Sequence, residues 1–418
     1  MRLVYTLFIY AYIFSIRVAA LVNAKAKLWV VGRKNSFNLL SQKILEFRKA
    51  EQQASIIWFH CASLGEFEQG RPLLEKMKET YPNEKILLTF FSPSGYEVRK
   101  NYPFADLVFY LPSDTLANAR RFVQIVQPKK VIFVKYEFWL NYLFVLHQNK
   151  VATYFISVIF RPEQYFFKTY GKWALKQLQQ VTHFFVQNES SMQLLKSNGI
   201  NQCTQVGDTR FDRVIKVAAE NKNIPLLAEF CENSLLLVAG SSWPEDEAML
   251  AEALKVAYNA KLNLKLILAP HEVTESHLAH IENLFSISKH RRYSTLSLTN
   301  LSGVDVLIID SVGLLSSLYR YASICFIGGG FGKGIHNCLE AAVYSKPIIF
   351  GPKFNKFDEA KELVNRGGAS VVNDKFELSN AILDLCLNEQ KRHTQGNVCS
   401  RFVSENQGAV IKIMKALA

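Results

Sequence analysis

A glycine-rich segment near residue 330 has the composition of an anion-binding loop. Residues 324–327 are apolar and predict a short buried strand, and five glycines follow between 328 and 334. His336-Asn337-x-x-Glu340 then opens an apolar pattern with helical spacing. Glycine lets the backbone approach a ligand closely, and unpaired amides at a helix start favour a phosphate. Glu340, one turn into the helix, is placed to accept hydrogen bonds from the two hydroxyls of a ribose, so the segment predicts a nucleotide site.

Two common phosphate-binding patterns are excluded by individual positions of this loop. A Walker A loop ending at Lys333 requires glycine at 327, which is isoleucine, and Ser or Thr at 334, which is glycine. No register of the loop fits G-x-G-x-x-G either. A tight structural turn followed by a surface glutamate is the alternative interpretation of the segment.

A second candidate is the Ser63-x-x-Glu66 pattern, which follows the apolar residues 56–61. Its spacing is that of a capping box, in which the serine caps a helix and the glutamate bonds back to the serine amide. Spacing alone therefore favours a structural role for Glu66.

The elements that must position these residues form two series of short apolar strands alternating with helix-length segments. Such alternation predicts parallel, doubly wound sheets and an α/β fold. We expect an N-terminal domain over residues 25–220, a polar linker over 221–233 and a C-terminal domain over 234–400. A final helix, 401–418, is expected to pack back on the first half. The predicted strands are 56–61, 85–91, 107–111, 130–134, 151–158 and 183–187, then 235–239, 264–269, 304–309, 324–327, 347–350 and 369–372.

The N-terminal segment 1–24 has the properties of a membrane anchor. Residues 3–22 are apolar apart from Arg17, and the stretch is long enough to span a bilayer. Four basic residues follow by position 34, which predicts that the rest of the chain lies in the cytosol. A helix lying in the membrane surface and an ordinary buried first helix remain alternatives, and a cleaved signal peptide is disfavoured by the weak n-region.

The overall charge restricts the partners. The chain has 49 Lys and Arg against 36 Asp and Glu, a net charge of +13, which suits an anionic membrane surface or a polyanionic substrate. Nucleic acid is disfavoured because the basic residues are dispersed and no nucleic-acid-binding motif stands out. The seven cysteines include no C-x-x-C pair, so we expect a reducing compartment and no structural metal.

Eight local motifs along the chain resemble, in their order, those of the 3-deoxy-D-manno-octulosonic acid (Kdo) transferases. The resemblance implies a GT-B fold, in which two Rossmann-like domains face a cleft and the C-terminal one binds CMP-Kdo. It also implies transfer of Kdo, with inversion, to a lipid A precursor (lipid IVA) at the cytoplasmic face of the inner membrane. The motifs are His60-x-Ala62-Ser63-x-Gly65-Glu66, Pro72-Leu73, Ser92-Pro93-Ser94-Gly95, Glu137-Phe138-Trp139-x-Asn141, Gln187-Asn188-Glu189, Gly207-Asp208-x-Arg210-Phe211-Asp212, His336-Asn337-x-Leu339-Glu340 and Gly351-Pro352.

The resemblance assigns roles to individual residues. Glu66 matches the family's general base, which reverses the structural interpretation given above. Arg210 stands where the family commonly has a lysine that steadies charge in the transition state, a replacement that keeps the charge and alters its geometry. The CMP contacts carry over onto Pro270, His271, Val312, Gly313, Leu314, Asn337, Cys338, Leu339 and Glu340.

Three positions depart from the family pattern. The usual Pro-Arg-His is Pro270-His271-Glu272, so the arginine expected near the phosphate is absent. The usual Met-Gly-Glu is Val312-Gly313-Leu314, which loses a carboxylate. A position that is acidic in the family is occupied by Lys135 in this chain. The nearby Glu137 is the candidate to take over the role of the missing acidic residue.

We expect neither a metal nor a cofactor, because the leaving group is a monophosphate that helix N-termini and basic side chains can stabilise. The D-x-D triplet typical of metal-using glycosyltransferases is also absent from the sequence. Two alternatives remain: a GT-B transferase that uses another nucleotide sugar, and a catalytically inactive membrane-bound protein that binds nucleotide or lipid A.

Overall fold

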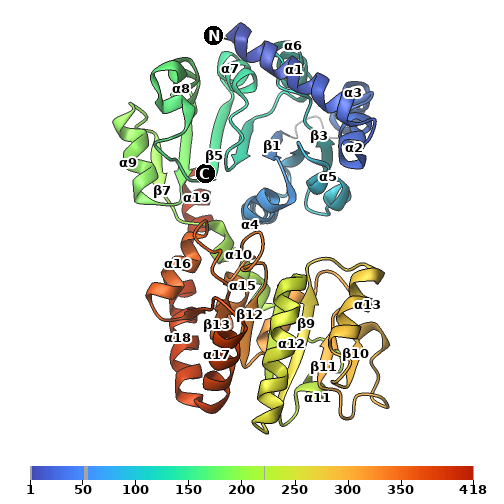
Figure 1. The fold of residues 1–418 in the computed structure, drawn as a ribbon. Coiled ribbons are helices and arrows are strands. Elements are labelled where there is room, and N and C mark those ends of the chain that lie inside the picture. The colour runs from blue at the N-terminus through green and yellow to red at the C-terminus, as the bar shows by residue number, and fades with distance from the viewer. Residues whose placement is uncertain (1, 51–54, 221, 418) are drawn as a thin grey trace. The chain divides into compact units, whose positions relative to one another are not determined.

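The computed structural model describes residues 2–50, 55–220 and 222–417. The chain divides into two compact units, Met1–Arg213 with Gln407–Ala418, and Val214–Asn406. Each unit is built on a seven-stranded parallel sheet with helices on both faces (Figure 1). The predicted class, an α/β fold of two Rossmann-like domains, is confirmed.

The first sheet has the strand order β3-β2-β1-β4-β5-β6-β7. All six residues of β1 are buried, as expected for a parallel strand covered on both faces. The order reverses between β1 and β4, and in open α/β sheets such a reversal opens a crevice beyond the carboxyl ends of the strands. The strands are β1 (Ile56–Cys61), β2 (Lys85–Phe90), β3 (Leu107–Tyr110), β4 (Lys130–Val134), β5 (Ala152–Val158), β6 (His183–Val186) and β7 (Cys203–Gln205).

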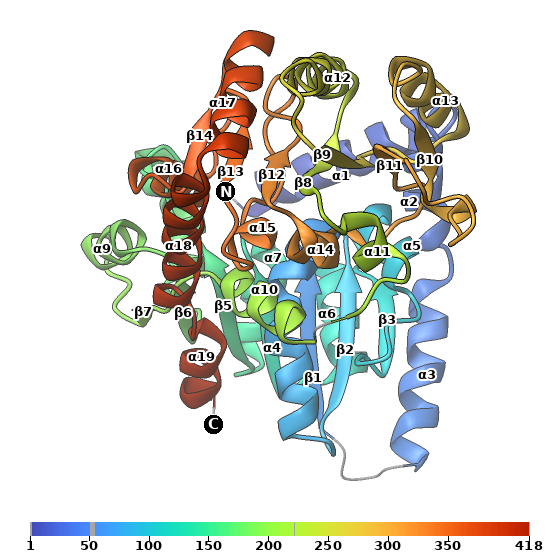
Figure 2. The same cartoon turned by 90° about the horizontal axis from the view of Figure 1, so that it is seen from below.

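Alternate residues of β1 enter two different apolar cores. Trp58 packs with Phe122 and Phe133 on one face of the sheet, while Phe59 packs with Phe67 on the other. The helix α3 runs beside the β3 edge (Figure 2). The helices of this unit are α1 (Arg2–Ala19), α2 (Ala24–Gly32), α3 (Ser36–Ala50), α4 (Leu64–Thr80), α5 (Pro93–Arg99), α6 (Leu116–Val126), α7 (Leu140–Gln148), α8 (Lys172–Leu178), α9 (Glu189–Ser197) and α19 (Ala409–Leu417), and α10 (Thr209–Ala219) begins in this unit and ends in the second.

The N-terminal helix α1 is long and apolar enough to cross a membrane by length and composition, yet one stripe of it is attached to the first unit. Ile9 is buried, and the Tyr5 hydroxyl donates to Asp114 Oδ2 at 2.6 Å. Asp114 also accepts from the amides of Asn141 and Tyr142 at 3.1 and 2.9 Å. The opposite face of α1 leaves large apolar side chains exposed, among them Leu3, Val4, Leu7, Phe8 and Phe14.

The C-terminal segment differs from the expected single helix over 401–418, whose last residue lies outside the described part of the chain. Residues 401–405 end α18 (Glu389–Glu405), which belongs to the second unit. The chain then turns at Gly408, whose φ of +96° is incompatible with a continuing helix. Only α19 packs on the first unit, against α4, and Asp212 accepts from the amides of Gly408 and Val410 at its start.

The second sheet has the order β10-β11-β9-β8-β12-β13-β14, with its reversal between β8 and β12. Its strands are β8 (Leu235–Ser242), β9 (Leu264–Pro270), β10 (His290–Arg292), β11 (Val306–Ile308), β12 (Ile324–Ile327), β13 (Ile348–Phe350) and β14 (Ala369–Val371). Its helices are α11 (Leu227–Cys231), α12 (Pro244–Asn259), α13 (Glu275–Leu284), α14 (Leu315–Leu318), α15 (Leu339–Ala342), α16 (Asp358–Asn365), α17 (Lys375–Leu387) and α18.

The segment expected to be a linker, 221–233, is not a simple linker over its described part. Residue 221 lies outside the described residues, and Leu227–Cys231 form α11. Leu227 and Phe230 are buried, so apolar packing attaches this segment to the second unit. The division between the units falls earlier, inside α10.

We predict that Asp114→Ala destabilises the first unit by about 2–4 kcal/mol, because it leaves two backbone amides and the Tyr5 hydroxyl without their acceptor. Tyr5→Phe removes one of these bonds and should cost about 1 kcal/mol. The measurement is urea unfolding followed by tryptophan fluorescence, since four of the five tryptophans lie in this unit. Tyr10→Phe, on the same helix, is the control and should leave the unfolding midpoint unchanged.

Candidate active site

The crevice of the first unit brings together residues from two neighbouring strand ends. Glu66 lies in the first turn of α4, directly after β1, and Lys135 to Glu137 directly follow β4. Because β1 and β4 pair in parallel, both segments emerge at the same edge of the sheet. Lys135 has a φ of +62°, so the chain turns sharply as it leaves β4.

Glu66 is fixed by its own helix start. The amide of Ala62 donates to Glu66 Oε2 at 2.5 Å, and the amide of Glu66 reaches Ser63 Oγ at 3.5 Å. Ser63 is therefore the N-cap, as the spacing predicts. The other half of the predicted capping box is present beside a second contact, because the Glu66 carboxylate bonds to the Ala62 amide and the Ser63 amide also lowers its pKa.

The surroundings of Glu66 favour its protonated form. Burial, followed by the charge of Glu137, raises the pKa of Glu66 to about 7. The Ala62 amide and the charge of Lys135 act in the opposite direction. A carboxyl group with a pKa near neutrality can exchange protons at neutral pH, which is the property required of a general base.

Glu137 is buried, with 8% exposure, in a hydrogen-bonded group of side chains. Its Oε2 lies 2.7 Å from the indole nitrogen of Trp139 and 3.2 Å from His60 Nε2. The other ring nitrogen of His60 lies 2.9 Å from Thr89 Oγ1, which accepts from the indole of Trp58 at 2.7 Å. These contacts hold the Glu137 carboxylate at the crevice.

The sequence analysis assigned no role to His60 or Thr89. The sequence feature that could have identified them is a polar residue inside an otherwise apolar strand. His60 lies in β1 and Thr89 in β2, and both are completely buried. A buried polar side chain needs a partner, and strand pairing places the two residues opposite each other. The partner itself could not be read from the sequence.

Arg210 forms an ion pair with Asp208 at the start of α10. The guanidinium donates to Asp208 Oδ2 from Nε at 2.8 Å and from Nη2 at 2.7 Å. Thr209 attaches this turn to the unit, since its hydroxyl donates to the Gln69 carbonyl at 2.5 Å and contacts Ser157 Oγ at 2.9 Å. The pairing orients Arg210 and offsets part of its charge.

In the second unit, the glycine loop 328–334 follows β12, as predicted. Close packing explains two of its glycines. A Cβ at Gly328 would lie 2.3 Å from the Ser241 carbonyl oxygen, and one at Gly330 would lie 2.5 Å from the Gly351 amide nitrogen. Gly329 has a φ of +90°. Only glycine fits these positions, so the loop backbone lies directly against its neighbours.

Three rings pack together at this loop: Trp243 follows β8, His271 follows β9, and His336 follows the loop itself. Trp243 and His271 have centroids 4.6 Å apart at 23°, and His271 and His336 have centroids 4.5 Å apart. Lys333 Nζ lies 4.6 Å from the centroid of the Trp243 ring. Burial, together with the nearby His271, lowers the pKa of His336 to about 4, so the His336 ring is neutral at pH 7.

Asp246, which the sequence analysis did not identify, supports both sides of this arrangement. It is completely buried, and its Oδ2 accepts from the amides of Trp243 at 2.9 Å and Gly329 at 2.7 Å. Its Oδ1 has no hydrogen-bond partner within the described part of the chain. Burial raises the pKa of Asp246 to about 6.

The remaining residues expected to contact CMP differ in accessibility. Asn337 Nδ2 donates to Glu340 Oε1 at 3.0 Å, while Cys338 and Leu339 are completely buried and offer a ligand only their backbone. Pro270 ends β9 beside His271. Val312, Gly313 and Leu314 follow β11, which pairs with β9, and the Val312 side chain is 91% exposed.

Comparison with known proteins finds similarity to the same family that the sequence motifs resemble. Residues 38–213 match the family model of the 3-deoxy-D-manno-octulosonic-acid transferases (kdotransferases). The chain is 29% identical over 338 residues to the 3-deoxy-D-manno-octulosonic acid transferase of Aquifex aeolicus, covering 79% of this chain and 85% of that protein. It is 27% identical to the transferase of the same name from Haemophilus influenzae, with 86% of each chain covered.

Two solved structures share the fold. The UDP-GlcNAc 2-epimerase from Neisseria meningitidis bound to UDP-GlcNAc matches with a TM-score of 0.61 at 13% identity, over 87% of this chain and 99% of that one. A glycosyltransferase from Rickettsia africae matches with a TM-score of 0.57 at 14% identity, over 87% and 98%. Both matches span the two units.

The charges around Glu66 give a prediction with a defined sign. Glu137→Gln removes a negative charge that raises the pKa of Glu66, so this pKa should fall below about 7. Lys135→Gln removes a positive charge that lowers it, so the pKa should rise. The measurement is the carboxyl infrared band titrated against pH, as the difference between each protein and its Glu66→Gln counterpart. Shifts in the same direction for both variants would contradict this electrostatic arrangement.

Proposed function

We propose that this chain is a glycosyltransferase of the Kdo transferase family and that it transfers Kdo from CMP-Kdo to a lipid A precursor, lipid IVA. The transfer inverts the configuration at the anomeric carbon, and Glu66 is the general base. The observation that carries this proposal is the position of Glu66 at the strand-order reversal with its pKa raised to about 7.

Glu66 takes the proton of the attacking sugar hydroxyl. As the new bond forms between that oxygen and C2 of Kdo, the bond from C2 to the phosphate oxygen breaks, and CMP leaves with the electron pair. The proton remains on Glu66 until it passes to solvent. Oε2 is held by the Ala62 amide, so Oε1 is the oxygen that we assign to the hydroxyl.

Glu137 supplies the second carboxylate of the site. The family's acidic position is occupied by Lys135, but Glu137 acts on Glu66 from two residues further along the same turn. The bonds from Trp139 and His60 hold Glu137 in place. Its negative charge keeps Glu66 a strong enough base, and Lys135 offsets part of this effect so that Glu66 still ionises near neutral pH.

The donor binds to the second unit through the glycine loop and the stacked rings. Glu340 accepts from the ribose hydroxyls, and amides of the loop donate to the single phosphate. His336 is neutral at pH 7 and adds no charge. Lys333, above the Trp243 ring in the same cluster, is therefore our candidate for the positive charge that the missing family arginine would provide.

The acceptor and the location follow from charge and exposure. The acceptor carries phosphates, and the chain carries a net charge of +13. The exposed apolar face of α1 attaches the enzyme to the inner membrane from its cytoplasmic side. Helix amides and Lys333 stabilise the departing CMP, so the proposed reaction uses no metal.

Glu66→Gln should lower kcat for transfer from CMP-Kdo to tetra-acylated lipid A precursor by about 10²–10⁴-fold while CMP binding is retained. The assay contains EDTA, and mass spectrometry counts the sugars added. In the wild type, kcat should rise with pH through about 7, because the base must be unprotonated.

The matched control is Glu79→Gln, the same change near the far end of α4, which should leave kcat unchanged. CMP binding by a wild-type protein that forms no product would overturn the transferase proposal and leave a binding protein. Stronger protection by UDP than by CMP would instead indicate another nucleotide-sugar transferase.

Lys333→Gln should weaken CMP binding about tenfold, because it removes the positive charge assigned to the phosphate. Calorimetric titration of the full chain with CMP and with cytidine separates the phosphate from the base, and cytidine binding should stay the same. Lys375→Gln is the control, since Lys375 also lies over an aromatic ring, that of Phe376, but on α17. Equal losses for CMP and cytidine would show that Lys333 does not act on the phosphate.

A further inference from the structure

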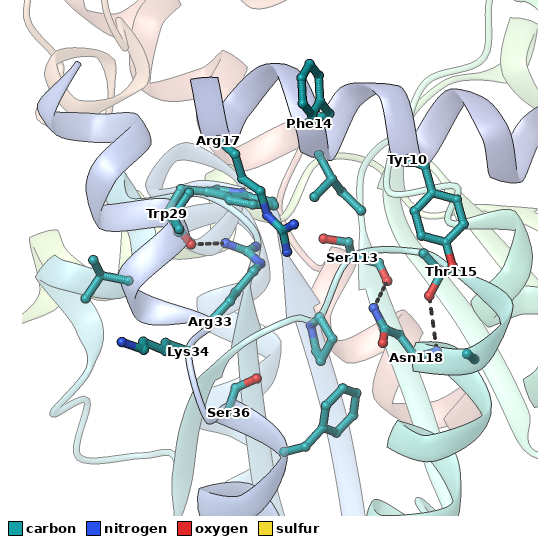
Figure 3. Close-up of a pocket in the computed structure, with 16 residues that line it drawn as sticks. Tyr10, Phe14, Arg17, Trp29, Arg33, Lys34, Ser36, Ser113, Thr115 and Asn118 are labelled. Carbon is teal, nitrogen blue, oxygen red and sulfur yellow. Dashed lines mark hydrogen bonds between the residues drawn. The ribbon is translucent and has the colours of Figure 1, made fainter. Parts of the chain in front are cut away.

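The first unit contains a cavity of about 870 Å³ that the proposed reaction does not use. It lies beneath α1, between that helix, α2 and the segment that joins β3 to α6 (Figure 3). Its volume is in the range of small-molecule binding sites. No Asp or Glu is among its lining residues in the described part of the chain, whereas three cationic side chains are: Arg17, Arg33 and Lys34.

Arg33 is held rigidly in this wall. Its guanidinium carbon lies 3.9 Å from the centroid of the Trp29 ring and 4.9 Å from those of Phe91 and Tyr110. It donates to three backbone carbonyl oxygens, those of Trp29, Phe91 and Leu111, at 2.7 to 3.1 Å. Carbonyl oxygens orient a guanidinium but do not neutralise it, and an arginine stays charged at any physiological pH.

Of the two other cations, Arg17 lies closest to this group. Arg17 extends from α1 toward Arg33, whereas the side chain of Lys34, also a lining residue, points away from the two guanidinium groups (Figure 3). Trp29 adds a further unsatisfied donor, because its buried indole N–H has no acceptor within the described residues. Such a cluster matches the oxygens of a phosphate, for which arginine provides geometrically suited donors.

The rest of the wall is mostly apolar. Ile13 and Phe14 of α1 and Val30 and Phe37 on the opposite side provide a surface that suits an acyl chain. Ser113, Thr115 and Asn118 form a polar end near Tyr10 (Figure 3). The combination of a cationic group and an apolar wall selects a molecule that is both anionic and acylated.

The cavity is separated from the candidate catalytic residues by aromatic rings. Phe91 lies 5.7 Å from Trp29 on the cavity side and 4.8 Å from Trp139 on the other, as centroid distances. Trp139 in turn bonds to Glu137. A molecule in the cavity is therefore on the far side of this wall from the sugar hydroxyl that Glu66 would activate.

We propose that this cavity binds one anionic phospholipid of the bilayer, with its phosphate at Arg17 and Arg33, Lys34 adding positive charge in the same wall, and an acyl chain along the apolar wall. The exposed apolar face of α1 borders the cavity and brings it to the membrane surface. The bound lipid joins α1 to α2 and so stabilises the membrane-bound position of the enzyme.

The test titrates the full chain with dihexanoyl phosphatidylglycerol below its micelle concentration, so that no charged surface contributes. The wild type should bind it saturably at one site. Arg17→Gln combined with Lys34→Gln should weaken binding at least tenfold. Lys25→Gln combined with Lys27→Gln is the matched control, since it removes the same charge from exposed positions on α2 outside the cavity, and should change binding by less than twofold. Equal losses in both variants, or no saturable binding by the wild type, would overturn the proposal.

Two further measurements distinguish a phospholipid from other possible occupants of the cavity. Inorganic phosphate and dihexanoyl phosphatidylcholine should each bind at least tenfold more weakly than the phosphatidylglycerol. Binding of inorganic phosphate as tight as that of the lipid would reveal a free-anion site and overturn the lipid assignment. In the transfer assay, the variant with Arg17→Gln and Lys34→Gln should have a KM for the acceptor within twofold of the wild-type value. A tenfold rise would place the acceptor's own phosphate in the cavity and overturn the choice of a phospholipid. Only this last arm rests on the proposed reaction.

Discussion

The electrostatics of the crevice in the first unit depend on two carboxyl groups, those of Glu66 and Glu137, that interact where water is partly excluded. Burial and the charge of Glu137 both disfavour the ionised form of Glu66, and their combined effect raises its pKa to about 7. Buried carboxylates need hydrogen-bond donors, and Ala62, Trp139 and His60 provide them. The requirement to satisfy these groups explains why β1 and β2 carry His60 and Thr89 inside otherwise apolar strands.

A buried carboxylate has a similar structural role in the second unit. Asp246 bonds to the amides of Trp243 and Gly329, and so connects the end of β8 to the glycine loop after β12. The stacked rings of Trp243, His271 and His336 then form a surface beside that loop. In both units a buried acidic side chain organises the two strand ends that meet at the reversal of strand order.

The structure also relates membrane association to the fold. The α1 helix is not a separate anchor, because Tyr5 bonds to the buried Asp114 and Ile9 is packed against the unit. Its other face stays apolar and exposed, so a helix with the composition of a membrane span is also a wall of a domain. The proposed interfacial position would satisfy both faces at once and would place the cationic cavity beneath α1 within reach of lipid head groups.

The sequence by itself determined the elements and the class of the chain. Apolar runs of strand length, alternating with helical segments, indicated two Rossmann-like domains, and local motifs such as that ending at Glu66 indicated the family. These signals are local, because strand, loop and cap preferences depend on a few neighbouring residues. The start of α4 at Ser63 and the loop at 328–334 were predictable for that reason.

Only the tertiary structure decided which distant residues meet. The contact of His60 with Glu137, the connection of Asp246 to Gly329 and the rings around Arg33 join residues from different strand ends or helices. The end of α18 before residue 406 and the helix at 227–231 were also mispredicted, since packing of buried side chains overrode the composition of the segment. Such contacts depend on strand order and on burial, which a local pattern does not specify. The pKa of Glu66 depends on the same factors, because burial and the charge of Glu137 raise it.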